Sequence, residues 1–142
     1  MTGRHPNATP LESLIEHTAA FSSRDNERYA DILSVPFVHL WPDGQVWSCD
    51  DGRQISLSAH YKAANLTAEN FDHTELDHAV VVLDWPDLKA YHVKFSRYTP
   101  RGGNAGQSEA IWVVVRADDG WKVKLRIGAV QTGTSQFARR DG

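Results

Sequence analysis

The 142-residue sequence has a single cysteine, Cys49, no long apolar run and no excess of basic residues. One cysteine forms neither an intramolecular disulfide nor a thiolate-based zinc site. The longest apolar runs, Ala79–Leu83 and Ala110–Val115, fall far short of the roughly 20 residues that span a bilayer. With 15 Lys and Arg against 18 Asp and Glu, the chain lacks the basic surface typical of nucleic-acid binding. A disulfide framework, a membrane partner and a nucleic-acid partner are therefore not expected.

Motifs of cofactor and metal chemistry are also absent. The sequence holds no phosphate-binding loop, dinucleotide fingerprint, nucleophile elbow or His-Glu-x-x-His pair, so no cofactor is expected. His73, Glu75 and Asp77 alternate along one predicted strand, but such positions lie about 7 Å apart and predict a solvated face, with no metal. Residues 1–10 contain no apolar signal-peptide core, which favours a cytoplasmic protein.

Helical patterns dominate the first half of the chain. Thr9-Pro10-Leu11-Glu12 has the pattern of a capping box with proline at the first helical position, and apolar residues follow at helical spacing to Phe21. A second, short helix is expected over Asp25–Leu33 and a third from near Asp51 to about Leu66. Between these two helices, Trp41-Pro42-Asp43-Gly44-Gln45 predicts the turn of a hairpin, because proline presets φ and Asp-Gly tolerates positive φ.

The second half of the chain alternates with a period of two. It predicts four strands, at residues 71–84, 89–99, 107–117 and 121–129, joined by short turns. Consecutive hairpins indicate an antiparallel sheet and an α+β fold. In the last strand every second residue from Trp121 to Ile127 is apolar, and the residues between them are Lys122, Lys124 and Arg126. This pattern predicts an apolar face under the helices and a polar outer face.

This arrangement predicts one domain over residues 9–130, with a flexible N-terminus at 1–8 and a flexible tail at 131–142. Three N-terminal helices packed in a strongly curved antiparallel sheet form a cone with a cavity at its wide end.

The chain resembles the nuclear-transport-factor-2-like (NTF2-like) superfamily, and within it the SnoaL-like and ketosteroid-isomerase-like small domains. The stretches that carry the resemblance are His17–Asp25, Tyr29–Leu33, Pro36–Leu40 and Asp119–Val123. The resemblance implies the cone-shaped fold with a hydrophobic pocket. This fold hosts isomerases, lyases, cyclases and non-catalytic binding proteins. It also assigns to His17, His39 and Trp112 the places of the isomerase's tyrosine, general-base aspartate and protonated aspartate. None of the three keeps the residue type, which argues against a standard ketosteroid isomerase.

Two histidines are the candidate catalytic residues. His39 is in strand phase with Phe37 and Trp41, so it is expected on the apolar inner face, and His17 lies at the edge of the buried stripe of the first helix. An imidazole in such a place can act as general base or acid near neutral pH. Structural alternatives remain open, since a helix-edge histidine is commonly bonded to backbone or water. The candidate substrate-binding residues are Trp41, Trp47, Tyr61, His73, Arg97 and Trp112.

These substrate-binding candidates have different roles. The aromatic rings could form flat apolar walls, or serve as core and interface residues. Arg97 could bind a carboxylate or enolate oxygen, or form a salt bridge with Glu109 across a hairpin.

Two functions follow as hypotheses. The first is cofactor-free acid–base catalysis, as an isomerase, lyase or cyclase, on a small apolar carbonyl or hydroxyl compound, with His39 as base. The second is a non-catalytic small-ligand-binding or dimerisation module. Ile111, Val113 and Val115 alternate with Ala110, Trp112 and Val114, so this strand is apolar on both faces and predicts a homodimer through the outer sheet face.

Overall fold

A computed structural model describes residues 8–132 of the chain. Within them lie three α-helices, a short 3₁₀ turn (Gly52–Gln54) and six strands. The helices are α1 (Pro10–Ser22), α2 (Asn26–Asp31) and α3 (Leu57–Ala63). The strands are β1 (Leu33–Leu40), β2 (Val46–Cys49), β3 (His73–Asp84), β4 (Leu88–Tyr98), β5 (Asn104–Ala117) and β6 (Gly120–Thr132). The α+β class and the three-helix cone predicted from sequence are confirmed.

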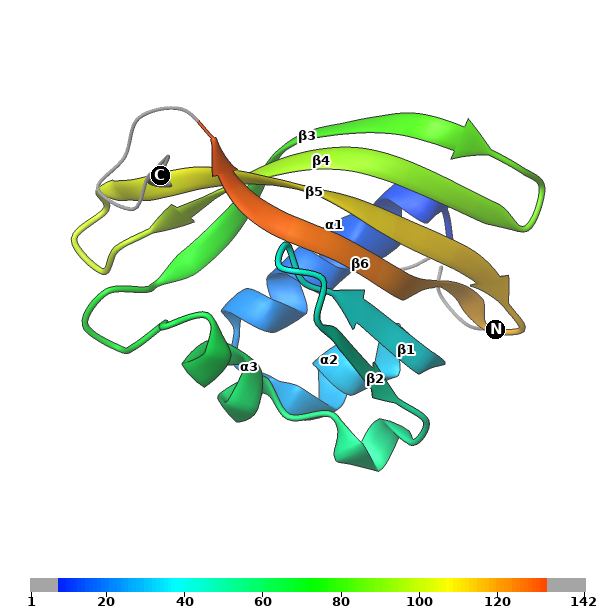
Figure 1. The fold of residues 1–142 in the computed structure, drawn as a ribbon, viewed down its shortest axis with the longest axis horizontal. Helices are drawn as coiled ribbons and strands as arrows, with labels where there is room; N and C mark the ends of the chain where they lie inside the picture. Colours follow the sequence, from blue (N-terminus) through cyan, green and yellow to red (C-terminus); the bar gives the residue numbers. More distant parts are fainter. Residues whose placement is uncertain (1–7, 133–142) are drawn as a thin grey trace, which may run out of the picture.

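The six strands form one curved sheet in the order β2-β1-β6-β5-β4-β3 (Figure 1). Strands β3 to β6 pair as consecutive antiparallel hairpins, as the sequence predicts. Strand β1, however, pairs in parallel with β6, so the sheet is mixed and not antiparallel throughout. This pairing joins segments almost 90 residues apart, and no turn motif in the sequence predicts it.

Local signals set the starts of the helices. The Thr9 hydroxyl accepts from the Glu12 amide and the Glu12 carboxylate accepts from the Thr9 amide, which completes the predicted capping box. The predicted third helix is split in two: Asp51 caps the 3₁₀ turn, Ile55 is extended, and Ser56 caps α3. The split shortens α3 to seven residues.

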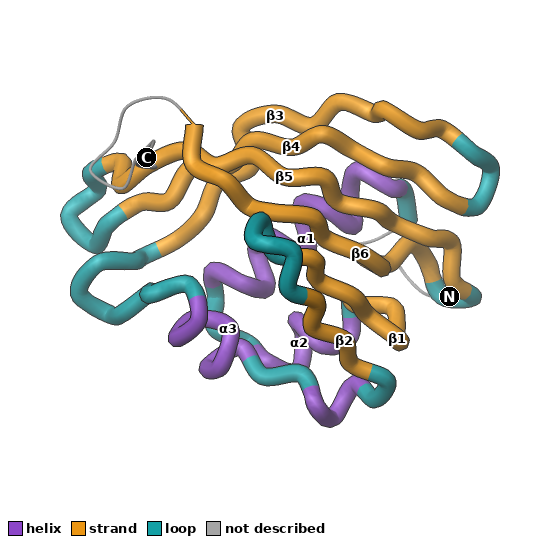
Figure 2. Tube along the Cα trace, viewed as in Figure 1, coloured by secondary structure: helices purple, strands orange, loops and turns teal. Residues whose placement is uncertain are grey.

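All three helices lie on the concave side of the sheet (Figure 2). Helix α1 packs across β3, β5 and β6, while α2 contacts α1 and β1. The core between these layers includes Leu14, Phe37, Val93, Val114 and Val123, each with 0% exposure. Burial of such side chains is the main stabilising contribution to a fold of this size.

A β-bulge at Lys124 reverses the two faces of β6. Val123 lies opposite Val114 and Leu125 lies opposite Val113, so Lys124 is the extra residue. The side chains after the bulge therefore change face, and Arg126 is buried with 6% exposure while Ile127 points outward at 37%. The prediction that Arg126 shares a polar outer face with Lys122 is wrong, because unbroken alternation does not survive an inserted residue.

The predicted flexible ends, 1–8 and 131–142, lie outside the described residues except for Ala8, Gln131 and Thr132. Within the described part of the chain, no helix is long and apolar enough to cross a membrane.

Candidate functional site

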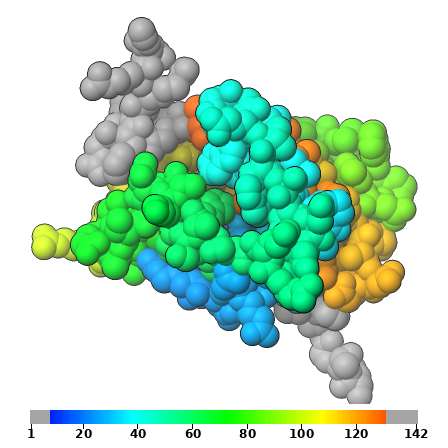
Figure 3. Space-filling model, turned by 60° about the horizontal axis from the view of Figure 1, so that its bottom comes forward, coloured from blue at the N-terminus to red at the C-terminus, as the bar shows by residue number. Residues whose placement is uncertain are grey.

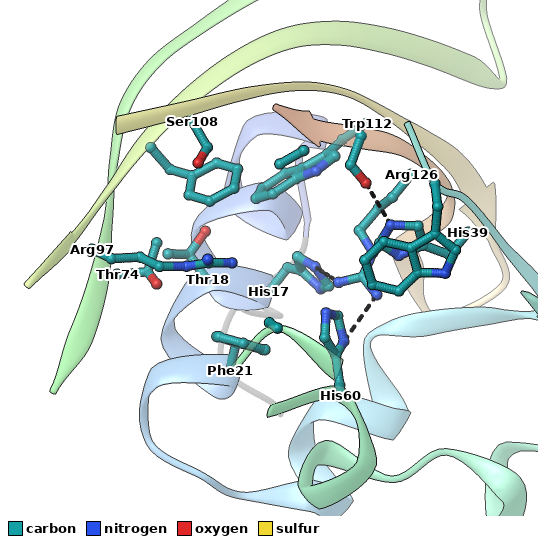
Figure 4. Close-up of a pocket in the computed structure, with 15 residues that line it drawn as sticks. His17, Thr18, Phe21, His39, His60, Thr74, Arg97, Ser108, Trp112 and Arg126 are labelled. Carbon is teal, nitrogen blue, oxygen red and sulfur yellow. Dashed lines mark hydrogen bonds between the residues drawn. The ribbon is translucent and has the colours of Figure 1, made fainter. Parts of the chain in front are cut away.

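Two adjoining cavities occupy the open end of the cone. The inner one, of about 190 Å³, lies between α1 and the sheet (Figure 4). The outer one, of about 660 Å³, lies between the β1–β2 hairpin and α3, where Figure 3 shows a small opening between the two segments. Four residues line both cavities: His39, Trp41, His60 and Arg126. The two cavities thus share one polar wall.

Arg126 is the centre of that wall. Its Nη1 donates to His17 Nε2 at 3.1 Å and to the Tyr29 hydroxyl at 2.6 Å, and its Nη2 donates to His60 Nδ1 at 3.2 Å. All three acceptors are neutral groups, and no carboxylate among the described residues pairs with this buried guanidinium. Burial raises the pKa of Tyr29, which keeps the hydroxyl protonated.

The hydrogen bonds of Arg126 fix the form of two histidine rings. Because a guanidinium only donates, His17 Nε2 and His60 Nδ1 are the unprotonated nitrogens of neutral imidazoles. Burial, and then the charge of Arg126, lower the pKa of both rings well below the ordinary value. The proton of His17 is therefore on Nδ1, a buried atom with no hydrogen-bond partner.

His39 stands on β1 with its ring in the shared wall, as its strand phase predicts. Nε2 donates to the Gly128 carbonyl at 2.5 Å, so Nδ1 is the basic nitrogen of the neutral ring. The ring also stacks on Trp41 at 4.1 Å between centroids. Burial, and then the charge of Arg126, lower the pKa of His39 from 6.5 to about 4.

Gly128 positions the carbonyl that holds His39. Its φ of +111° is one that residues with a side chain rarely adopt, and a Cβ there would lie 3.2 Å from the Glu109 carbonyl oxygen. Glycine is therefore required at this point of β6.

Arg97 approaches the inner cavity from β4, on the side opposite Arg126 (Figure 4). Its guanidinium packs against the Phe95 ring at 5.6 Å, and its buried Nε has no hydrogen-bond partner. Burial, and then the charge of Arg126, lower the pKa of Arg97. The predicted alternative of a salt bridge with Glu109 is wrong: Arg97 lies opposite Gly106, and Glu109 pairs with His92.

The structure brings most of the predicted site residues together. Around the inner cavity lie His17, His39, Trp41, Arg97 and Trp112. Trp47 lines the outer cavity.

Tyr61 and His73 line neither cavity. The Tyr61 hydroxyl donates to the Phe21 carbonyl, and the ring packs among Phe21 and Phe71. His73 bonds Asp72 and Glu75 at 2.7 and 2.8 Å and stacks on Tyr98, so these two carboxylates raise its pKa. Neither residue is placed to touch a ligand in the cone.

Sequence reasoning missed Arg126, His60 and Tyr29. The bulge at Lys124 hid Arg126, and the split of the third helix changed which of its residues face the cavity. Tyr29 was missed because its bond to Arg126 joins residues 97 positions apart, which no local pattern reveals.

The residues of the wall do not suggest a metal centre. Three histidines approach it, but the Arg126 guanidinium bonds two of them and the Gly128 carbonyl bonds the third. Across residues 8–132, no group of three or more His, Cys, Asp or Glu side chains is arranged to hold a metal ion.

A cone-shaped sheet that encloses helices and a polar-walled cavity defines the class of NTF2-like proteins. The family model described as NTF2-like protein (DUF6841) matches residues 12–128. The chain therefore belongs to this family. No curated protein matches the chain.

Solved structures share the fold at low sequence identity. A protein of unknown function with a cystatin-like fold from Nostoc punctiforme is 11% identical, with a TM-score of 0.67 over 89% of this chain and 91% of that one. An NTF2-like protein from Novosphingobium aromaticivorans is 16% identical, with a TM-score of 0.66 over 90% and 82%. ActVI-ORFA from Streptomyces coelicolor is 13% identical, with a TM-score of 0.62 over 86% and 93%. At such identities the likeness concerns the fold.

Proposed function

We propose that this chain performs cofactor-free acid–base chemistry on a small carbonyl or hydroxyl compound in the cone, with His39 as the general base. One observation carries the proposal: the Gly128 carbonyl holds His39 Nε2, which leaves Nδ1 as the basic nitrogen of a ring that lines both cavities. The fixed tautomer matters because a base must present an unprotonated nitrogen in a defined direction.

The electrostatics of the wall fit that role. The low pKa of His39 keeps the ring neutral, which is the form a base requires, although it also makes the base a mild one. A mild base suffices where the negative charge left on the substrate is stabilised. Buried donors supply that stabilisation here: the Nε–H of Arg126 and the Nδ1–H of His17 both lack an acceptor. Trp112 and Trp41 provide flat walls for an apolar substrate.

Exchange of acidic protons with solvent tests this chemistry without knowledge of the natural substrate. The protein is incubated in D₂O with a panel of small aryl ketones, and loss of the proton signal next to the carbonyl is followed by NMR. We expect exchange above the buffer rate that His39→Gln reduces by at least about a hundredfold. His78→Gln, on an exposed residue, is the matched control.

Absence of exchange above the buffer rate, or the same rate in His39→Gln, would refute catalysis by His39. The second candidate, a non-catalytic binding module, is favoured by the size and aromatic lining of the outer cavity. Saturable ligand binding without any exchange would support it.

We also propose a homodimer formed through the outer sheet face. Ile111 lies opposite Ile127 and Val113 opposite Leu125, so the convex faces of β5 and β6 carry one apolar patch. His92 beside it bonds Glu109 of the same chain at 2.8 Å, so the border of the patch is polar. The mass of the protein in solution, measured by light scattering at micromolar concentration, tests this: a monomer would contradict it.

A further inference from the structure

The buried polar atoms that lack hydrogen-bond partners gather at one place. Among the described residues there are four such side-chain atoms: His17 Nδ1, Thr74 Oγ1, Arg97 Nε and Arg126 Nε. Each belongs to a residue that lines the inner cavity. Buried polar atoms are almost always paired in folded proteins, so four unpaired ones on one small cavity indicate a missing partner.

That missing partner is an acceptor. Both arginine atoms carry N–H groups, the Arg126 bond fixes the His17 proton on Nδ1, and the Thr74 hydroxyl can donate as well. Four donors without a partner thus line the cavity, and no carboxylate lies among its lining residues. A neutral ligand with one oxygen would satisfy one or two of them, whereas an anionic group with two oxygens can satisfy more.

The charges of the cavity point the same way. Arg97 and Arg126 enter from opposite sides with His17 between them (Figure 4). The described lining of the inner cavity contains no Asp or Glu, so both positive charges are uncompensated. Burial of an unpaired charge is strongly unfavourable, and a counter-ion removes that cost.

We propose that the inner cavity binds the carboxylate of a small organic acid between Arg97 and Arg126, and that the apolar body of the acid extends into the outer cavity. This inference rests on the proposed function and names its substrate class. A carboxylate is favoured over a phosphate because Phe95 and Trp112 make flat apolar walls beside the arginines, and a dianion is costlier to dehydrate there. Arg126 lines both cavities, as a shared anchor requires.

Isosteric acid and amide pairs test the proposal directly. The probes are benzoate, phenylacetate and 3-phenylpropanoate, each against its amide, with binding measured by calorimetry and by quenching of tryptophan fluorescence. We expect at least one acid to bind about tenfold or more tighter than its amide, because bonds to a charged acceptor are the stronger ones. Phenyl phosphate and inorganic phosphate form a further arm, and they are expected to bind more weakly than the best acid.

Variants locate the site. Arg97→Gln is expected to weaken the best acid by about tenfold or more and to leave its amide unchanged. Arg97→Lys keeps the charge but loses the paired N–H donors of the guanidinium, and it is expected to give a smaller loss of acid affinity. Arg53→Gln, at a side chain that is 90% exposed, is the matched control and is expected to bind as the wild type does.

Several results would overturn the proposal: acids that bind no better than their amides, an acid affinity that Arg97→Gln leaves unchanged, or tighter binding of phosphate. If Arg97→Gln fails to fold by circular dichroism, the acid and amide comparison on the wild type decides alone. Arg97-dependent acid binding without proton exchange would refute the proposed catalysis and keep this inference. Proton exchange of neutral ketones without acid binding would refute this inference and keep the proposed catalysis.

Discussion

The three histidines with lowered pKa values, His17, His39 and His60, predict a strong loss of stability in mild acid. In the folded chain the pKa of His39 is about 4, against 6.5 for an unperturbed ring. Between these two values the unfolded chain takes up a proton that the folded chain refuses, so acid favours unfolding. At about 1.4 kcal/mol per pH unit, His39 alone lowers the free energy of unfolding by about 2 kcal/mol between pH 7 and pH 5. His17 and His60 act in the same direction, because their pKa values are also lowered.

Replacement of His39 by glutamine isolates its share. Glutamine keeps an N–H near the position of Nε2 for the Gly128 carbonyl but takes up no proton. The free energy of unfolding is measured by urea denaturation at pH 7 and pH 5, with tryptophan fluorescence as the signal and one protein concentration throughout. We expect His39→Gln to lose about 2 kcal/mol less than the wild type between the two pH values.

The matched control is His78→Gln, since His78 is exposed on β3. It is expected to follow the wild-type pH dependence. If His39→Gln loses as much stability in acid as the wild type does, the burial argument for His39 is refuted.

Other predictions concern stability and assembly. Arg97→Met is expected to raise the free energy of unfolding of the ligand-free protein by about 1–2 kcal/mol in urea denaturation, since it replaces a half-buried guanidinium, whose Nε has no hydrogen-bond partner, with an apolar side chain; a decrease would show that the guanidinium stabilises the fold. Tyr29→Phe takes an acceptor from Arg126 and should lower the same quantity by about 1–3 kcal/mol, and no change would contradict that bond. Thr9→Ala breaks the capping box and should cost about 1 kcal/mol, which an unaltered urea midpoint would disprove. Ile127→Lys should convert the proposed dimer to monomer in light scattering, and an unchanged mass would exclude this face.

The sequence predicted those parts of the fold that short-range chemistry determines. The capping box at Thr9, the proline–glycine turn before β2 and the alternation of the long strands all act within a few residues. The inner face of β1 followed from the same logic, and this placed His39 correctly between Phe37 and Trp41. The parallel pairing of β1 with β6 lay beyond such reasoning, because it depends on how the whole sheet closes.

The centre of the candidate site was harder to predict for a related reason. A single inserted residue, Lys124, turned Arg126 from the predicted outer face into the cavity, and nothing in the local pattern marks the bulge. His60 was missed because the third helix breaks at Ile55 and restarts with Ser56 as its cap. Arg126 and Ser56 are both visible in the sequence, Arg126 as a charged residue among apolar ones and Ser56 as a residue type that can cap a helix. Their consequences appear only when the elements pack.

The features that define this site all reduce the stability of the empty protein. Two uncompensated arginines, four unpaired donors and three histidines with lowered pKa values share one end of the cone. A chain under selection for stability alone would replace them with apolar side chains of similar volume. The fully buried core, which includes Leu14 and Val114, offsets their cost. A single anion in the inner cavity would relieve the charges and the unpaired donors together, and by weakening the field of Arg126 it would raise the pKa of His39 toward the range in which a base is effective.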